Sequence, residues 1–328
     1  MRHQRRRLLQ FAWLVAALGQ AAGVQAEIAP ILDEPLQLWV GYNANNPLSE
    51  LARGIAERLE AELGVPVTVE NRPGAGGRLA AQGVAQAERD EAMLLLAGPA
   101  TTIVAPLVFD QLAFDPMQDL VPISLAVTFP LALAASPQSN LTHVADLGRW
   151  VRANPLGFTV GVPGAGTLPY FLAGELDRHL PETAEIINYR DSGPLLADLM
   201  SDRLPLAIDT VKALKPAERA GRATLLAVSG LTRHPDFPET PTFAEVGLPF
   251  TAQDWFAFFA PARMPAGTRR ELGERLAHVL QDPTLRDTLV RLGFTPKGLD
   301  PTDTVVAVEE ARAQWWPLIE ASGFRVGR

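Results

Sequence analysis

The sequence predicts an α/β fold made of two βα blocks, and three observations support that prediction. Short apolar runs alternate with longer amphipathic segments, which is typical of βα units with largely parallel sheets. The alternation occurs in two sets along the chain. Two long apolar stretches, at 121–135 and 255–260, connect the sets. We therefore expect two lobes joined by a hinge of two crossing strands.

The first block holds three expected strands, at 36–42, 65–70 and 93–97. A helix after the first strand has one apolar stripe at steps of three and four, formed by Leu48, Leu51, Ile55, Leu59 and Leu63. A further helix is expected at about 77–88.

The second block holds strands expected at 158–161, 186–189, 204–208 and 224–228. Helices are expected between them, near 167–180, 193–202 and 212–220. The chain then returns through 255–260 and ends in helices near 266–281, 283–292 and 302–321, which we expect to pack on the first lobe. The predicted domains are 27–127 plus 255–328, and 128–254.

The N-terminus has the three-part pattern of a secretory signal peptide. Arg2 and Arg5–Arg7 are basic, residues 8–23 are apolar apart from two glutamines, and small residues precede a cleavage site after Ala26. The apolar run is short for a membrane anchor. The arginine pair also fits a twin-arginine signal, so the export route stays open while export itself is predicted.

The composition of the mature chain limits its partners. Removing 26 of the 328 residues leaves 302, and the loss of four arginines takes the formal charge from −8 to −12. An acidic chain with scattered cations is unsuited to nucleic acid. The chain has no cysteine, which excludes disulfides and a lipid-modified N-terminal cysteine. We expect an exported protein that is free in the periplasm and not lipid-anchored.

The first candidate site is the loop from Tyr42 to Pro47, between the first strand and helix. Asn46 is a good N-cap and Pro47 suits the first helical turn. The free amides of that turn lie at the carboxyl edge of the sheet, where open α/β sheets bind ligands, and they favour an anion. Plain helix capping is the alternative.

The second candidate is the glycine-rich loop 161–167, again between a strand and a helix. Its glycine spacing is like that of a phosphate loop, but no lysine follows Gly166, so a nucleotide site is disfavoured. What remains is a nest of amides beside the hydroxyl of Thr167, suited to a carboxylate.

Other motifs are weaker. The glycines at 74–77 give an incomplete dinucleotide fingerprint, because position 79 is leucine. Asp209 ends a buried strand and either binds ligand or caps the next helix; the residue alone favours the cap. The scattered histidines suggest no metal site, no nucleophile–base motif is present, and no cofactor is expected.

Several segments together resemble the Bug receptors, the solute receptors of tripartite tricarboxylate transporters. The segment ENRPGAGG at 70–77 is similar to the family signature. Further matches follow in the family's order, at 114–120, 188–194, 198–200, 238–249 and 255–261, and at Trp316 in the closing helices. The resemblance covers essentially the whole mature chain.

The resemblance implies a two-lobed periplasmic-binding-protein fold of type II, the Venus flytrap, with two crossover strands. It implies that a small carboxylate is held between the lobes and delivered to permease subunits, with the receptor a monomer. The ligand-binding positions that it implies are Tyr42, Asn43, Ala44, Asn45, Asn46, Thr101, Gly164, Ala165, Gly166, Thr167 and Asp209. It also makes the glycines at 74–77 a structural turn.

The chain departs from the family where specificity is set. Asn45 and Asn46 stand at the family's glycine positions, Ser49 stands where an aspartate is usual, and Leu168 follows Thr167 instead of a histidine. The ligand class is therefore open. Two alternative functions also stay open: a periplasmic ligand sensor for a signalling system, and a periplasmic enzyme acting on a carboxylate, which the lack of a nucleophile–base set disfavours.

Overall fold

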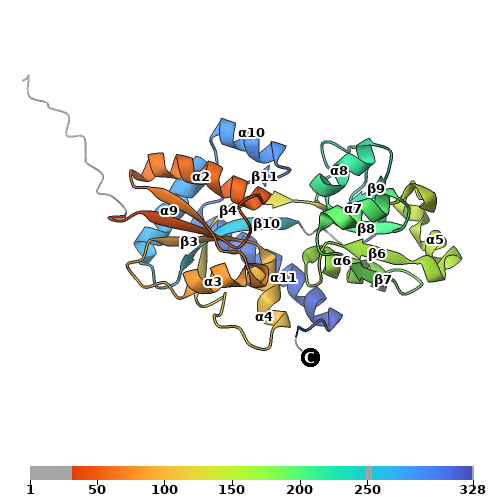
Figure 1. The fold of residues 1–328 in the computed structure, drawn as a ribbon, viewed down its shortest axis with the longest axis horizontal. Coiled ribbons are helices and arrows are strands. Elements are labelled where there is room, and N and C mark those ends of the chain that lie inside the picture. The colour runs from red at the N-terminus through yellow and green to blue at the C-terminus, as the bar shows by residue number, and fades with distance from the viewer. Residues whose placement is uncertain (1–31, 249–250, 252, 327–328) are drawn as a thin grey trace, which may run out of the picture. The chain divides into compact units, whose positions relative to one another are not determined.

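The computed structural model describes residues 32–248, 251 and 253–326, and the predicted signal peptide lies outside them. Two separate β-sheets with flanking helices make up the described chain (Figure 1). This confirms the predicted α/β class. The predicted domain boundaries at 127/128 and 254/255 stay a prediction.

The first sheet has six strands in the order β11-β4-β10-β3-β1-β2. Their bounds are β1 Leu36–Val40, β2 Val67–Asn71, β3 Met93–Ala97, β4 Leu120–Phe129, β10 Asp254–Pro261 and β11 Thr295–Pro296. Strand β1 pairs in parallel with β2 and β3. Strand β10 lies antiparallel between β3 and β4.

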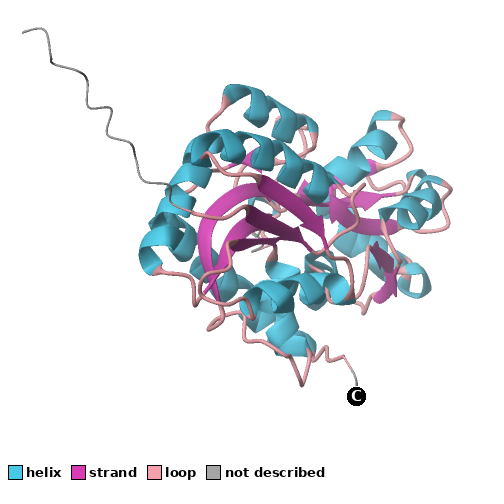
Figure 2. Cartoon of the chain, turned by 60° about the vertical axis from the view of Figure 1, so that its left-hand side comes forward, coloured by secondary structure: helices cyan, strands magenta, loops and turns pink. Residues whose placement is uncertain are grey.

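Helices lie on both faces of the first sheet (Figure 2). They are α2 Pro47–Leu63, α3 Arg78–Ala85, α4 Ala105–Val108, α9 Ala266–Val279, α10 Pro283–Arg291 and α11 Pro301–Ser322. The expected stripe of α2 is buried, and the helix ends at Gly64, whose φ of 71° gives the left-handed C-cap that glycine favours. As predicted, α9 and α11 pack on this sheet, both against β4.

The second sheet has five strands in the order β7-β6-β8-β5-β9. Their bounds are β5 Leu131–Ala135, β6 Thr159–Val162, β7 Glu185–Asn188, β8 Leu206–Thr210 and β9 Thr224–Val228. Its helices are α5 Leu147–Ala153, α6 Leu168–Arg178, α7 Ser192–Met200 and α8 Val211–Arg219. The sequence analysis did not predict α5, although Leu147, Trp150 and Val151 stand at the helical spacing of three and four in this short segment.

The expectation of largely parallel sheets was wrong where the chain crosses between them. Strand β5 is antiparallel to both β8 and β9, and β4 is antiparallel to β10 and β11. The reason is that β4 runs out of the first sheet and continues, after Pro130, directly as β5 of the second. Strand β10 later brings the chain back into the first sheet, so β4 and β10 lie side by side in opposite directions.

The two crossing segments are buried, as their composition predicts. In the chain from β4 to β5, every residue from Ile123 to Ala135 is buried. Trp255 and Phe259 of β10 are also in the core, which agrees with hinge packing and not with a stacking platform. Among the described residues, no helix is long and apolar enough to cross a bilayer.

Candidate functional site

The first candidate loop joins β1 to α2. Asn46 caps α2 as expected, because its Oδ1 accepts a hydrogen bond from the Leu48 N–H at 2.9 Å. Asn45 and Ala44 are exposed, and their N–H groups donate to no atom of the described residues. The turn therefore offers free amides to an anion, while the Asn46 side chain is used locally.

Two polar side chains hold this loop, the buried Ser49 and the half-buried Asn71. The Ser49 hydroxyl donates to the Asn43 carbonyl oxygen at 2.9 Å and accepts from Asn71 Nδ2 at 2.7 Å. The same nitrogen of Asn71 donates to the Tyr42 carbonyl oxygen at 2.9 Å. Sequence reasoning noted Ser49 only as a departure from the family and passed over Asn71, since neither contact is visible from chain spacing.

The glycines at 74–77 form a turn that packs under the first loop. Gly74, Ala75, Gly76 and Gly77 all have positive φ, from 49° to 141°. A Cβ atom on Gly41 would lie 2.4 Å from the Gly77 Cα, so this close approach requires glycine at position 41, while the φ of 89° favours glycine at position 77. The motif is a structural turn, not a cofactor loop.

Thr101 lies next to that turn. It follows β3 in a π-helical turn, residues Ala100–Val104, and is buried. Its Oγ1 is 3.4 Å from the Gly76 carbonyl oxygen, a weak hydrogen bond at best. The structure thus gathers the loops after β1, β2 and β3 at one edge of the first sheet, around Tyr42 and Thr101.

The glycine-rich loop joins β6 to α6. Gly164 and Gly166 have φ of 113° and 71°, conformations that favour glycine. The Thr167 hydroxyl donates to the Gly164 carbonyl oxygen at 2.8 Å, so it holds the loop closed. The N–H groups of Ala165, Gly166 and Thr167 donate to no described atom. The loop therefore has backbone N–H groups available to bind an anion. The Thr167 hydroxyl cannot donate to that anion at the same time, because its proton is bonded to the Gly164 carbonyl oxygen.

An aromatic residue from the far end of the chain lies on this loop. A Cβ atom on Gly166 would be 2.8 Å from the Phe324 ring, and that ring also contacts the rings of Tyr170 and Phe171 at 5.0 and 6.1 Å. The Val326 N–H bonds to the Val108 carbonyl oxygen, which ties the same segment to α4 of the first sheet. The C-terminal segment thus joins the glycine-rich loop to the first sheet.

Asp209 does not cap the following helix, α8. The sequence analysis favoured a helix cap for this residue, and that interpretation was wrong. The N-cap of α8 is Thr210, whose hydroxyl accepts from Ala213 N. Asp209 Oδ1 accepts from the Thr210 N–H, while the buried Oδ2 has no partner of hydrogen-bonding geometry among the described residues. Burial raises the pKa of Asp209 to about 6, and the nearby Ser192 hydroxyl offsets part of that rise.

One acidic residue escaped the sequence reasoning. Asp254 begins β10, and burial raises the pKa of its carboxyl to about 7. Burial raises the pKa of Tyr42 to about 12, and the negative charge of Asp254 adds to that rise. The sequence did contain a signal for this residue, because Asp254 is a charged residue directly before the aromatic run that crosses between the sheets.

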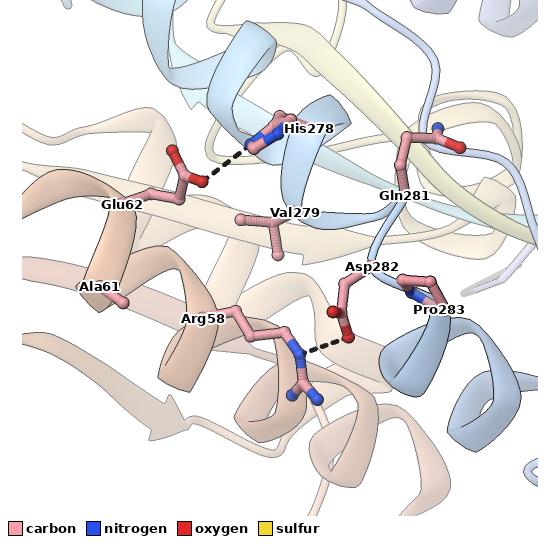
Figure 3. Close-up of a pocket in the computed structure, with 8 residues that line it drawn as sticks. All are labelled: Arg58, Ala61, Glu62, His278, Val279, Gln281, Asp282 and Pro283. Carbon is pink, nitrogen blue, oxygen red and sulfur yellow. Dashed lines mark hydrogen bonds and ion pairs between the residues drawn. The ribbon is translucent and has the colours of Figure 1, made fainter.

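A surface pocket of about 430 Å³ lies elsewhere, between α2, α9 and the start of α10 (Figure 3). Its polar side chains are paired with one another: Arg58 Nε lies 3.0 Å from Asp282 Oδ1, and His278 Nδ1 lies 2.8 Å from Glu62 Oε1. None of the predicted ligand residues lines it. Among the described residues, no cluster of histidine, aspartate and glutamate could hold a metal ion.

Comparison with known proteins gives a consistent set of relatives. Residues 51–324 match the model of the tripartite tricarboxylate transporter family receptor. The chain is 29% identical over 319 residues to a UPF0065 protein of Bordetella bronchiseptica, covering 97% of this chain and 94% of that protein. It is 27% identical to protein BugT of Bordetella pertussis, covering 95% and 96%.

Solved structures agree on the fold. A Rhodopseudomonas palustris protein, Rpa4515 with adipate, has 28% identity and a TM-score of 0.76, covering 89% of this chain and 98% of that one. MatC of the same organism, with bound malate, has 27% identity and a TM-score of 0.72, covering 88% and 99%. The periplasmic binding protein BugD has 26% identity and a TM-score of 0.73, covering 89% and 99%. The chain thus belongs to the tripartite tricarboxylate transporter receptor family, whose members are periplasmic solute-binding proteins and not enzymes.

Proposed function

We propose that this protein is an extracytoplasmic receptor that binds one small carboxylate between two lobes and delivers it to the permease of a tripartite tricarboxylate-type transporter. The lobes would be residues 27–127 with 255–328, and residues 128–254. Cleavage after Ala26 would release the receptor into the periplasm. The observation that carries the proposal is the pair of loops with unbonded amides, one after β1 and one after β6.

The chemistry of these loops suits a carboxylate. Backbone N–H groups at helix N-termini favour negative charge, and both loops lead directly into helices, α2 and α6. The two relatives solved with adipate and malate each hold a dicarboxylate. Binding requires no catalytic group, because the ligand acts by stabilising the closed arrangement of the lobes in proportion to its differential affinity.

The test is a calorimetric titration of the mature protein against linear dicarboxylates of three to six carbons. We expect at least one to bind. The variant Thr167→Val should weaken that binding by about tenfold or more, because it removes the hydroxyl that closes the glycine-rich loop on Gly164.

The matched control is Thr288→Val on α10, where the hydroxyl donates to the Thr284 carbonyl oxygen and accepts from Arg291 of the same helix. It should leave affinity unchanged. If no carboxylate binds the parent protein, the proposed function is wrong; if both variants bind as the parent does, the glycine-rich loop is not part of the site.

A further inference from the structure

The last helix, α11, packs on β4 of the first sheet and also lies beside α6 of the second (Figure 1). It ends at Gly323, whose φ of 64° gives a left-handed C-cap. Beyond this cap, the Phe324 N–H donates to the Ser322 hydroxyl oxygen at 3.1 Å, and that hydroxyl donates to the Ile319 carbonyl oxygen at 2.6 Å. The chain therefore leaves the helix along a defined path.

The ring of Phe324 packs where the glycine-rich loop enters α6. Its centroid lies 5.0 Å from that of the Tyr170 ring and 6.1 Å from that of the Phe171 ring. A Cβ atom on Gly166 would lie 2.8 Å from the edge of the Phe324 ring. Ring pairs at such separations attract each other beyond the effect of burial alone. The ring therefore holds the loop and the start of α6 together.

Two residues further on, the same segment is attached to the first sheet's side of the molecule. The Val326 N–H donates to the Val108 carbonyl oxygen at 2.8 Å, and Val326 forms a parallel β-bridge with Phe109. The Arg78 guanidinium lies 3.7 Å from the centroid of the Phe109 ring, a cation–π contact. Arg78 begins α3 directly after the turn at 74–77. The second attachment thus lies beside the turns that follow β2 and β3.

Residues 324–326, which we call the C-terminal strap, are short for the two attachments that they make. Two peptide units separate Phe324 from Val326, so their Cα atoms are at most about 7 Å apart. The glycine-rich loop cannot move far from α4 while both attachments persist. The strap therefore stabilises the arrangement in which that loop lies close to the first sheet's loops.

This restraint affects the N–H groups of the glycine-rich loop that donate to no described atom. A loop that is already held in its binding geometry loses less conformational freedom when a ligand arrives, so its affinity is higher. The coupling is reciprocal: a ligand bound to the loop strengthens the attachment of the strap by the same factor.

We propose that Phe324 is a positioning residue for ligand binding. Its ring fixes the glycine-rich loop through the C-terminal strap, so that the N–H groups of Ala165, Gly166 and Thr167 are aligned before the ligand arrives. Phe324 acts through the loop and not by contact with the ligand. This inference rests on the proposed function and names a residue that regulates the same site.

Hydrogen exchange of the ligand-free protein tests the positioning directly. The Phe171 N–H donates to the Thr167 carbonyl oxygen at 3.2 Å, the bond that joins the loop to α6. Phe324→Ala should raise the exchange rate of this amide by about tenfold or more, because local opening is easier without the ring. Phe324→Leu keeps a large apolar side chain and should restore most of the protection.

The matched control is Trp150→Ala on α5. It removes another half-buried ring that packs on the core, from a helix that precedes β6 and not from the strap. The exchange rate of the Phe171 amide should stay as in the parent. Thermal unfolding of every variant identifies the temperatures at which all of them are folded, and the comparisons are made there.

Calorimetry with malonate, succinate, glutarate and adipate measures the effect on binding. For each dicarboxylate that binds the parent, Phe324→Ala should lower the affinity by about tenfold. Phe324→Leu should lower it less. Trp150→Ala should bind as the parent does, even where it unfolds at a lower temperature.

The second attachment separates the strap from local packing around the ring. Val326→Pro removes the N–H that donates to Val108 and leaves the side chain of Phe324 unchanged. It should also lower the affinity. Because both residues act in one strap, it should add little to the effect of Phe324→Ala in the double variant. Fully additive effects would overturn the strap.

The two proposals fail in different ways. If no dicarboxylate binds the parent, the proposed receptor function is wrong, and the exchange rates still decide whether the Phe324 ring holds the loop. If the parent binds a dicarboxylate and Phe324→Ala leaves either the exchange rate or the affinity unchanged, the positioning role of Phe324 is overturned and the receptor function stands.

Discussion

Asn71 Nδ2 donates to the Ser49 hydroxyl oxygen at 2.7 Å, and this bond ties the end of β2 to the first turn of α2. Ser49 is fully buried and passes the connection on to the Asn43 carbonyl oxygen. Ser49, which the sequence analysis treats as a departure from the family pattern, therefore has a structural role in this chain. Together with Asn71, it bonds the carbonyl oxygens of Tyr42 and Asn43 and so sets the shape of the loop between β1 and α2.

Ser49→Ala should lower the free energy of unfolding by about 1–3 kcal/mol, because it removes two hydrogen bonds in a buried site and leaves the Asn43 carbonyl oxygen without that donor. Denaturant unfolding of the mature protein measures the change. Ser201→Ala, an exposed hydroxyl at the end of α7, should stay within about 0.5 kcal/mol of the parent. Equal effects in the two variants would show that the Ser49 network is not stabilising.

Replacing glycine by alanine should change the stability of the protein in opposite directions at Gly41, which lies close to Gly77, and at Gly174, which has open space around it. Gly41→Ala places a methyl group 2.4 Å from backbone atoms that cannot rotate away, so it should destabilise the protein and weaken ligand binding. Gly174→Ala, inside α6 with open space around it, should stabilise by about 0.5–1 kcal/mol. A tolerated Gly41→Ala, seen by thermal unfolding, would contradict the required contact.

The raised pKa of Asp209 predicts a pH-dependent stability. The carboxyl has a pKa of about 6 when folded and about 3.9 in an unfolded chain, so the folded state binds more protons between these values. Stability from this group is therefore present at low pH and is lost as pH rises from about 4 through 6. The two-unit difference corresponds to roughly 3 kcal/mol at most.

Asp209→Asn should remove the loss of folding stability that the Asp209 carboxyl causes as pH rises. Without ligand, we expect the variant to gain stability over the parent as pH rises from about 4 to about 7, measured by urea unfolding at each pH. The exposed Asp287→Asn on α10 serves as the control. A pH-independent difference for Asp209→Asn would mean that the carboxyl titrates normally in the folded protein.

In the first loop, we expect Asn46 to affect the stability of the protein and Asn45 to affect which ligands bind. Asn46→Ala removes the N-cap of α2 and should cost about 1 kcal/mol, whereas Asn46→Gly should cost only a few tenths. Asn45 is exposed and makes no cap, so Asn45→Gly should leave stability unchanged and broaden the range of carboxylates that bind. One thermal-shift screen compares all three variants. An unchanged ligand profile for Asn45→Gly would show that the Asn45 side chain does not affect which carboxylates bind.

Local features of the chain were readable from sequence because their causes are local. The stripe of α2, the Asn46 cap and the buried β3 at Met93–Ala97 depend on periodicity, capping chemistry and apolar runs. Strand ends were less well predicted: the first strand was expected to reach Tyr42 and ends at Val40. Pairing with β2 and β3 decides where a strand ends, and those partners are distant in the chain.

The sequence by itself determined the class of fold, the family and the order of the candidate loops, since alternating apolar patterns and glycine spacing record local backbone needs. Only the tertiary structure decided what the polar side chains do. It joined Ser49 to Asn71 and placed Phe324 on Gly166. These relations depend on strand order and on packing between segments far apart in the chain, and no local pattern encodes such contacts.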